Sequence, residues 1–142
     1  MPETLNHESG AESVTVRIPV QIDPAVTPNG RGHWRKKHRL QQELKEAAYY
    51  AAYNANLEMW EPEPPLTLNY LIALGKGRRR MDDTNAIASM KYLEDGIAAA
   101  LGIDDKHFRF GRIQQERDPE GIGYIEVAIE HVARPAGAEG QG

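Results

Sequence analysis

The segment Leu66-Thr67-Leu68-Asn69-Tyr70-Leu71-Ile72-Ala73-Leu74 decides the fold of this chain. Its apolar side chains recur at every second position from Leu66 to Leu74, which is the period of a strand that buries one face. Gly75-Lys76-Gly77 ends the strand. A helical period follows from about residue 84 or 85 to residue 101, with a predicted buried stripe of Ile87, Met90, Leu93, Ile97 and Leu101.

The flanking sequence predicts the remaining elements. Residues 13–20 alternate like a strand, and Pro19 indicates an edge or an end of it. Residues 24–32 predict a loop, and residues 35–56 a first helix. Residues 107–115 and 122–132 predict two strands paired as a hairpin through the turn Asp118-Pro119-Glu120-Gly121. We therefore expect an α+β fold (mixed α/β), with a small mixed sheet of about four strands and two helices.

Length and composition point to one globular domain. The chain has 142 residues, of which 40% are apolar and 27% charged. We expect residues 1–12 to form a flexible arm, residues 13–132 the folded domain, and residues 133–142 a flexible tail. No apolar run approaches a membrane span, and no signal segment is recognisable, so we expect a cytoplasmic location and no membrane partner. The absence of cysteine excludes disulfides and thiolate chemistry, so any metal must bind Asp, Glu or His.

Charge is distributed unevenly along the chain. The net charge is -4, yet nine of the 17 basic residues form two clusters, and these nine are the predicted nucleic-acid contacts: Arg31, Arg35, Lys36, Lys37, Arg39, Lys76, Arg78, Arg79 and Arg80. Five acids lie close together in the sequence: Asp82, Asp83, Asp95, Asp104 and Asp105. The pattern indicates a mildly basic body that carries a concentrated acidic site.

Carboxylates beside arginines suit metal-assisted phosphate hydrolysis, because Mg²⁺ prefers carboxylate oxygens and the basic groups offset the repulsion of a phosphodiester. Each residue also has a structural interpretation. Asp82 and Asp83 can cap the second helix, Asp104 and Asp105 can be turn residues, and Lys91 with Asp95 can form a surface ion pair. In the first cluster, Trp34 can stack on an unpaired base among phosphate-binding basic residues, or it can pack into the core.

The residues Arg79-Arg80-Met81-Asp82-Asp83-Thr84-Asn85, Lys91, Asp95-Gly96 and Gly102-Ile103-Asp104-Asp105 resemble the RusA family of Holliday-junction resolvases. The segment of residues 28–35 is similar to that family's loop after the first strand, and the resemblance spans about residues 14–132. It implies a dimeric, RusA-like endonuclease of phages and prophages, dependent on Mg²⁺ (or Mn²⁺), that cuts four-way junctions in DNA recombination and repair. Such an enzyme would act in the cytoplasm of a bacterial or phage-infected cell.

By position, the resemblance implies that Asp82 and Asp105 are catalytic together with Lys91. Asp82, Asp83, Asp104 and Asp105 would hold the metal, with Asn85, Asp95 and Trp34 in support. The second carboxylate of the family's Asp-x-Asp-Asn element falls on Thr84, a weaker and neutral ligand. Either Asp83 replaces it, or metal binding is weakened, or the protein binds junctions without cutting them well.

The length of the second helix raises a further point. A helix over residues 85–101 spans about 25 Å, so Asp82 and Asp105 would lie at opposite ends. Two antiparallel copies across a two-fold axis would bring Asp82 of one beside Asp105 of the other, which predicts a composite site in a homodimer unless the helix is broken or shorter. The leading hypothesis is a nuclease. The alternatives are a non-catalytic branched-DNA binder and an unrelated protein whose acids are caps.

Overall fold

A computed structural model describes residues 11–26 and 33–132. The elements, in chain order, are β1 (Ala11–Ile18), η1 (Pro24–Val26), α1 (Trp34–Asn54), η2 (Leu57–Met59), β2 (Leu66–Leu74), α2 (Asp83–Leu101), η3 (Asp105–His107), β3 (Phe108–Arg117) and β4 (Tyr124–Val132). The α+β fold predicted from the sequence is confirmed, with two long helices and a four-stranded mixed sheet. The predicted arm of residues 1–12 overlaps the sheet by two residues, because β1 begins at Ala11.

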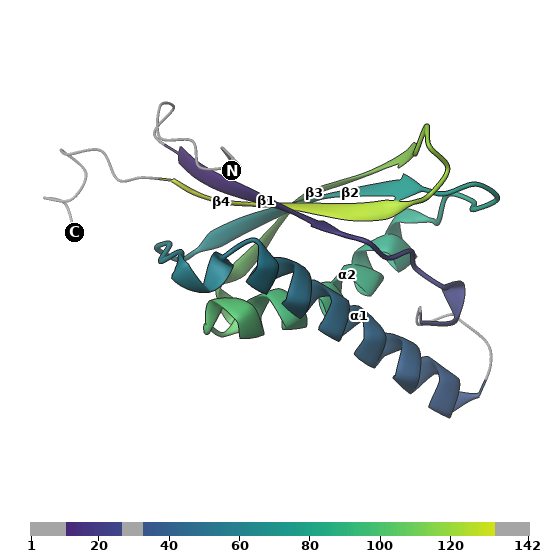
Figure 1. The fold of residues 1–142 in the computed structure, drawn as a ribbon, viewed down its shortest axis with the longest axis horizontal. Helices are drawn as coiled ribbons and strands as arrows, with labels where there is room; N and C mark the ends of the chain where they lie inside the picture. The colour runs from purple at the N-terminus through teal and green to yellow at the C-terminus, as the bar shows by residue number, and fades with distance from the viewer. Residues whose placement is uncertain (1–10, 27–32, 133–142) are drawn as a thin grey trace, which may run out of the picture.

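The sheet has the strand order β1-β4-β2-β3. Both long helices lie on one face of it (Figure 1). β4 is antiparallel to β1 and β2, whereas β3 is parallel to β2, with α2 as the crossover connection that a parallel pair requires. β1 is an edge strand, as Pro19 after its end indicated.

The predicted hairpin of the last two strands is wrong. β3 and β4 lie on opposite sides of β2. The chain that leaves β3 therefore passes over the end of β2 before it enters the sheet again as β4. The turn itself forms, but it bonds to the end of β2 and the loop after it: Asp118 N donates to Leu74 O (2.8 Å), and Lys76 N donates to Gly121 O (2.9 Å). The apolar alternation of β4 belongs to a central strand, because Ile125, Val127 and Ile129 are fully buried.

The core lies between the sheet and the helices. β2 contributes Leu66, Leu68, Tyr70 and Ile72, all buried as its alternation predicted. Each such side chain contributes about 1.5–3 kcal/mol to folding. From α2, Met90, Leu93 and Ile97 are buried as predicted, and Leu101 packs against the core. Ile87 is 42% exposed, so its predicted place in the stripe is wrong.

The two helices approach each other closely at Gly96. A Cβ atom on this residue would lie 2.2 Å from the carbonyl oxygen of Lys45 and 2.9 Å from the Cβ of Ala48. No side chain fits between the two backbones at this crossing. Gly96 therefore places the neighbouring Asp95 of α2 directly beside α1.

β3 is the second edge of the sheet, and few of its side chains are buried. Two phenylalanines at alternate positions of β3 have different environments. Phe108 packs against the core, whereas Phe110 is 50% exposed and stacks on Tyr70. At this point the β2–β3 register shifts, because Leu68 pairs with Phe110 and Asn69 with Arg112, which leaves Gly111 as the extra residue of a bulge.

Candidate nucleic-acid interface and acidic cluster

Asp82 precedes the first turn of α2 and has the capping contacts of its structural interpretation. Its Oδ1 accepts a hydrogen bond from Asn85 N (2.8 Å), and its Oδ2 accepts one from Asn85 Nδ2 (3.1 Å). A carboxylate in this position satisfies a backbone N–H of the first turn and faces the positive end of the helix dipole. The supporting role predicted for Asn85 therefore has a geometric basis, since it contacts both oxygens of Asp82.

The residues that precede Asp82 form a loop over 75–81, which we call the arginine loop. Side chains of β3 hold its backbone in place. Arg117 Nη1 donates to Gly75 O and to Arg78 O (both 2.8 Å). Gln115 bonds Met81 twice, because its Nε2 donates to Met81 O and its Oε1 accepts from Met81 N (both 2.8 Å). Sequence reasoning missed Gln115 and Arg117. The signal that could have found them is the presence of polar residues on the next strand after the basic loop.

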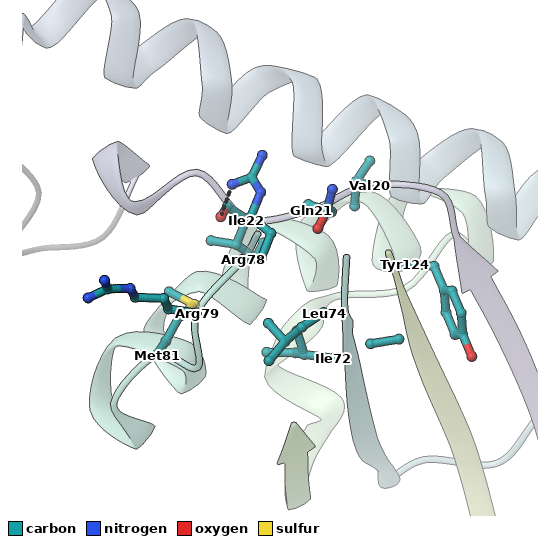
Figure 2. Close-up of a pocket in the computed structure, with 10 residues that line it drawn as sticks. Val20, Gln21, Ile22, Ile72, Leu74, Arg78, Arg79, Met81 and Tyr124 are labelled. Carbon is teal, nitrogen blue, oxygen red and sulfur yellow. Dashed lines mark hydrogen bonds between the residues drawn. The ribbon is translucent and has the colours of Figure 1, made fainter. Parts of the chain in front are cut away.

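The three arginines of this loop have different environments. Arg78 Nη1 donates to Ile22 O (3.3 Å), and both residues line a small, largely apolar cavity of about 20 Å³ (Figure 2). The guanidinium of Arg79 points away from that cavity (Figure 2). Arg80 lies 3.5 Å from Asp83, in an ion pair whose partners are both well exposed. Asp83 is thereby turned toward Arg80, and its predicted role as a metal ligand has no support from this contact.

A wider pocket of about 380 Å³ lies along the arginine loop and shares part of its lining with that small cavity. Its lining comprises Ile22, Pro24, Gly77, Arg78, Arg79, Arg80, Met81, Asp82 and Asn85. Three arginines and one aspartate are among these residues, so the lining is basic overall. Arginine is the residue best suited to bidentate contact with phosphate. The pocket therefore has the size and charge to hold an anionic group next to Asp82.

The start of α1 carries the other basic cluster. Arg35, Lys36 and Arg39 are exposed, and Lys37 is half-buried. Trp34 is 66% exposed, so the interpretation that it packs into the core is wrong. η1 packs against α1 and also contributes Pro24 to the basic pocket, so both basic clusters lie at the same end of the molecule. Arg31 lies outside the described residues.

The remaining predicted site residues gather at the other end of α2. Asp104 Oδ1 accepts a hydrogen bond from Lys106 N (2.9 Å), and this bond holds the pKa of Asp104 below its usual value. A side-chain hydrogen bond with Asp95 raises the pKa of Asp105, although the positive charge of Lys91 opposes the increase. Asp95 itself lies 3.8 Å from Lys45 of α1. We call Asp95, Asp104 and Asp105 the acidic cluster.

Beside this cluster, Glu94 and Tyr70 form a pair that sequence reasoning missed. The Tyr70 hydroxyl donates a hydrogen bond to the Glu94 carboxylate. Burial raises the pKa of Glu94, whereas the bond from Tyr70 and the charge of Lys91 lower it. Burial also raises the pKa of the Tyr70 hydroxyl, and the Glu94 charge raises it further, so the hydroxyl keeps its proton. A tyrosine at an inward strand position is an ordinary core residue. Nothing in the sequence around Tyr70 therefore indicates that its hydroxyl bonds to Glu94 of α2.

One chain does not bring the predicted metal ligands together. The 19 residues of α2 separate Asp82 from Asp104 and Asp105, about 28 Å at 1.5 Å per residue. Within residues 11–26 and 33–132, no three His, Asp or Glu side chains are arranged to hold a metal ion. Within a single chain, Asp82 therefore cannot share one Mg²⁺ with Asp104 or Asp105. Thr84 is an exposed residue of the first helical turn.

No protein-family model matches this chain. An uncharacterized protein of Xylella fastidiosa (strain Temecula1 / ATCC 700964) is 35% identical over 88 residues, which cover 58% of this chain and 55% of that protein. The chain thus matches about half the length of this curated relative. None of the helices in the described part of the chain has the length and apolar character of a membrane span.

Three solved structures show weak likeness at 9–13% identity. A HypE-HypF complex has a TM-score of 0.39 over 92% of this chain and 35% of that chain. The periplasmic domain of Helicobacter pylori MotB has a TM-score of 0.39 over 96% and 92%. The OmpA-like domain of FopA1 from Francisella tularensis has one of 0.32 over 93% and 81%. Likeness this low carries no inference about function, and the resemblance to the RusA family stays a prediction.

Proposed function

We propose that this protein is a divalent-metal-dependent endonuclease that hydrolyses phosphodiester bonds in Holliday junctions and other branched DNA, in recombination and repair. The observation that carries the proposal is the basic pocket beside Asp82, lined by Arg78, Arg79 and Arg80. A phosphate in this pocket would meet arginine side chains, whose guanidinium groups can make bidentate contacts with phosphate oxygens. Lys76 and the start of α1 extend the positive surface at the same end of the molecule, as binding of a polyanion requires.

The proposal requires two copies of the chain. One end of the molecule carries the arginine loop and Asp82, and the other carries the acidic cluster. An antiparallel pair of α2 helices about a two-fold axis would set the basic end of each copy against the acidic end of the other. In that arrangement Asp82 of one copy and Asp105 of the second copy would be the metal ligands. Mg²⁺ or Mn²⁺ would supply neutralisation of the phosphate charge.

Lys91 is the proposed partner of the phosphate at the acidic end. It is exposed on α2, and its charge acts on both Glu94 and Asp105. A lysine beside these carboxylates places a positive group where the phosphate of a DNA strand would arrive. Its role in the proposal is to offset the repulsion between the acidic cluster and the DNA strand.

The test is incubation of the full chain with a labelled four-way junction, with and without Mg²⁺ or Mn²⁺, and with a linear duplex of equal length as a substrate control. We expect metal-dependent cleavage of the junction. Asp82→Asn is the matched variant, because asparagine caps a helix as well as aspartate does. It should abolish cleavage while binding stays the same or tightens, since a charge that repels phosphate is gone. Cleavage that is undiminished in Asp82→Asn would contradict the assignment.

A second candidate is a branched-DNA binder without catalytic activity. Two observations favour it: the carboxylates of Asp82 and Asp104 already accept capping hydrogen bonds, and Thr84 stands where the resemblance implies a carboxylate. The same assay separates the two functions, because tight binding of the junction with no cleavage at any metal concentration supports the binder. A chain that neither binds nor cuts the junction has neither function.

A further inference from the structure

The first turn of α1 presents an exposed aromatic ring with an imidazole and a guanidinium near it. The rings of His33 and Trp34 stack loosely, with centroids 6.0 Å apart and planes inclined by 23°. The Arg35 guanidinium carbon lies 5.4 Å from the centre of the Trp34 ring. Because Trp34 stays 66% exposed, these neighbours do not cover it. The ring is therefore open to a planar ligand, and the Arg35 guanidinium beside it attracts anions.

The N-terminal turn of α1 has residues that do not favour helix stability. His33 is the capping residue, and its Nδ1 accepts a hydrogen bond from Arg35 N (3.1 Å), although Ser, Thr, Asp and Asn make better caps. The first turn has no acidic residue and carries Arg35, Lys36 and Lys37 instead. Positive charges at this end oppose the helix dipole. Departures from local rules of this kind occur at functional positions, where a ligand supplies the missing charge.

We propose that His33, Trp34 and Arg35 form a platform on which an unpaired base of single-stranded DNA stacks, while Lys36 and Lys37 contact the adjoining phosphates. The inference rests on the proposed function, because it names the part of a branched DNA that this end of the molecule binds. A polyanion complements the charge of this turn, and the π-face of a base complements the open indole ring. An aromatic ring without the basic neighbours would lack the attraction for the phosphates.

Tyr50 provides the internal comparison. It lies further along α1 and is 60% exposed, almost as much as Trp34. Its ring meets Tyr49 edge-on, with centroids 5.2 Å apart. No basic side chain among the described residues forms a cation–π contact with it. The platform therefore depends on the combination of ring and cations, and Tyr50 is the matched control position.

The test uses the intrinsic fluorescence of the full chain. The sequence holds two tryptophans, so Trp60→Phe leaves Trp34 as the sole reporter. We expect an oligothymidylate single strand to quench the Trp34 emission saturably, and added salt to weaken the binding. Inorganic polyphosphate should bind at higher concentration without quenching, because it has charge but no base. Unchanged emission with oligothymidylate, or equal quenching by both polymers, would overturn the platform.

Affinity measurements with variants provide an independent readout. Trp34→Ala should weaken binding of the oligothymidylate about tenfold or more, and Trp34→Phe should retain most of the affinity because it keeps an aromatic face. Tyr50→Ala should leave the affinity unchanged. Equal losses in Trp34→Ala and Tyr50→Ala would contradict the proposal. So would a blue shift of Trp34 emission with anionic phospholipid vesicles in a protein that does not respond to the oligonucleotide, since this would identify a membrane surface as the partner.

Failure of the nuclease and failure of the platform give different results. A protein that binds single strands through Trp34 but cuts no junction has the platform without the proposed activity. A protein that cuts junctions, with Trp34→Ala and wild type binding single strands equally, has the activity without the platform.

Discussion

Asp82 and Asp105 stand at opposite ends of α2: Asp82 caps the first turn, and Asp105 follows the helix in η3. A continuous helix of 19 residues holds them about 28 Å apart. One chain therefore cannot place both carboxylates on the same ion. A metal site that uses both carboxylates therefore needs two chains.

Complementation between inactive variants tests this relationship. Asp82→Asn and Asp105→Asn should each abolish junction nicking alone. After the two are unfolded and refolded together, mixed dimers would hold one composite site with both natural carboxylates. Nicking should return to about a quarter of the wild-type rate, because half the dimers are mixed and one of their two sites is intact. If each site belonged to a single chain, the mixture would stay inactive.

Restoring the missing carboxylate should raise activity. Thr84 is exposed in the first turn of α2, where an added negative charge is compatible with the helix dipole. We expect Thr84→Asp to increase metal-dependent cleavage of the four-way junction while the thermal midpoint changes little. Thr84→Asn is the control of equal size without charge. A gain of the same size in both variants would show that charge at this position is not the cause.

The crossing of the two helices predicts a large effect of one methyl group. In Gly96→Ala the new Cβ would lie 2.2 Å from Lys45 O, so the helices must separate. We expect the free energy of unfolding to fall by about 1–3 kcal/mol, despite the better helix propensity of alanine. Ala99→Ser, at an exposed position of the same helix, should stay within about 0.5 kcal/mol. Urea denaturation measures both, and a neutral Gly96→Ala would show that the crossing is looser than described.

The Tyr70–Glu94 pair predicts a stability that depends on pH. Burial raises the pKa of Glu94 in the folded state above its unfolded value of about 4.3. The folded state thus holds this proton more tightly, so the contribution of Glu94 to stability is greatest below pH about 4.3 and is lost as the pH rises through the folded pKa. In Tyr70→Phe the pKa of Glu94 should rise further, and the free energy of unfolding at pH 7 should fall by about 1 kcal/mol.

Unfolding in urea at several pH values measures this effect. Glu94→Gln is the control, because it removes the titrating group, and the additional loss caused by Tyr70→Phe in that background should no longer depend on pH. A loss in Tyr70→Phe that is equal at pH 4 and pH 7 would show that the hydroxyl acts on packing and not on the charge of Glu94.

The contribution of Asp118 to stability should depend on pH in the sense opposite to that of Glu94. Its carboxylate accepts hydrogen bonds from the backbone N–H groups of Gly123 (2.8 Å), Glu120 (3.0 Å) and Ile122 (3.1 Å). These bonds hold the pKa of Asp118 below its usual value. Its contribution to stability is therefore present above the unfolded pKa of about 3.9 and is lost as the pH falls through the folded value. Acid unfolding of Asp118→Asn should depend less on pH in this range than that of the wild type, and an identical acid profile would contradict the prediction.

The sequence alone determined the elements that short-range chemistry specifies. The alternation of residues 66–74, the helical period before residue 101 and the cap at Asp82 are patterns of neighbouring residues, and they predicted the α+β fold with both helices. The sequence also showed that the basic residues form two clusters and that five acids lie close together along the chain. Only the tertiary structure decided that β4 lies between β1 and β2, because strand partners are chosen by packing between segments far apart in the chain. For the same reason, only the fold paired Glu94 with Tyr70 and Lys45 with Asp95, and left Trp34 uncovered.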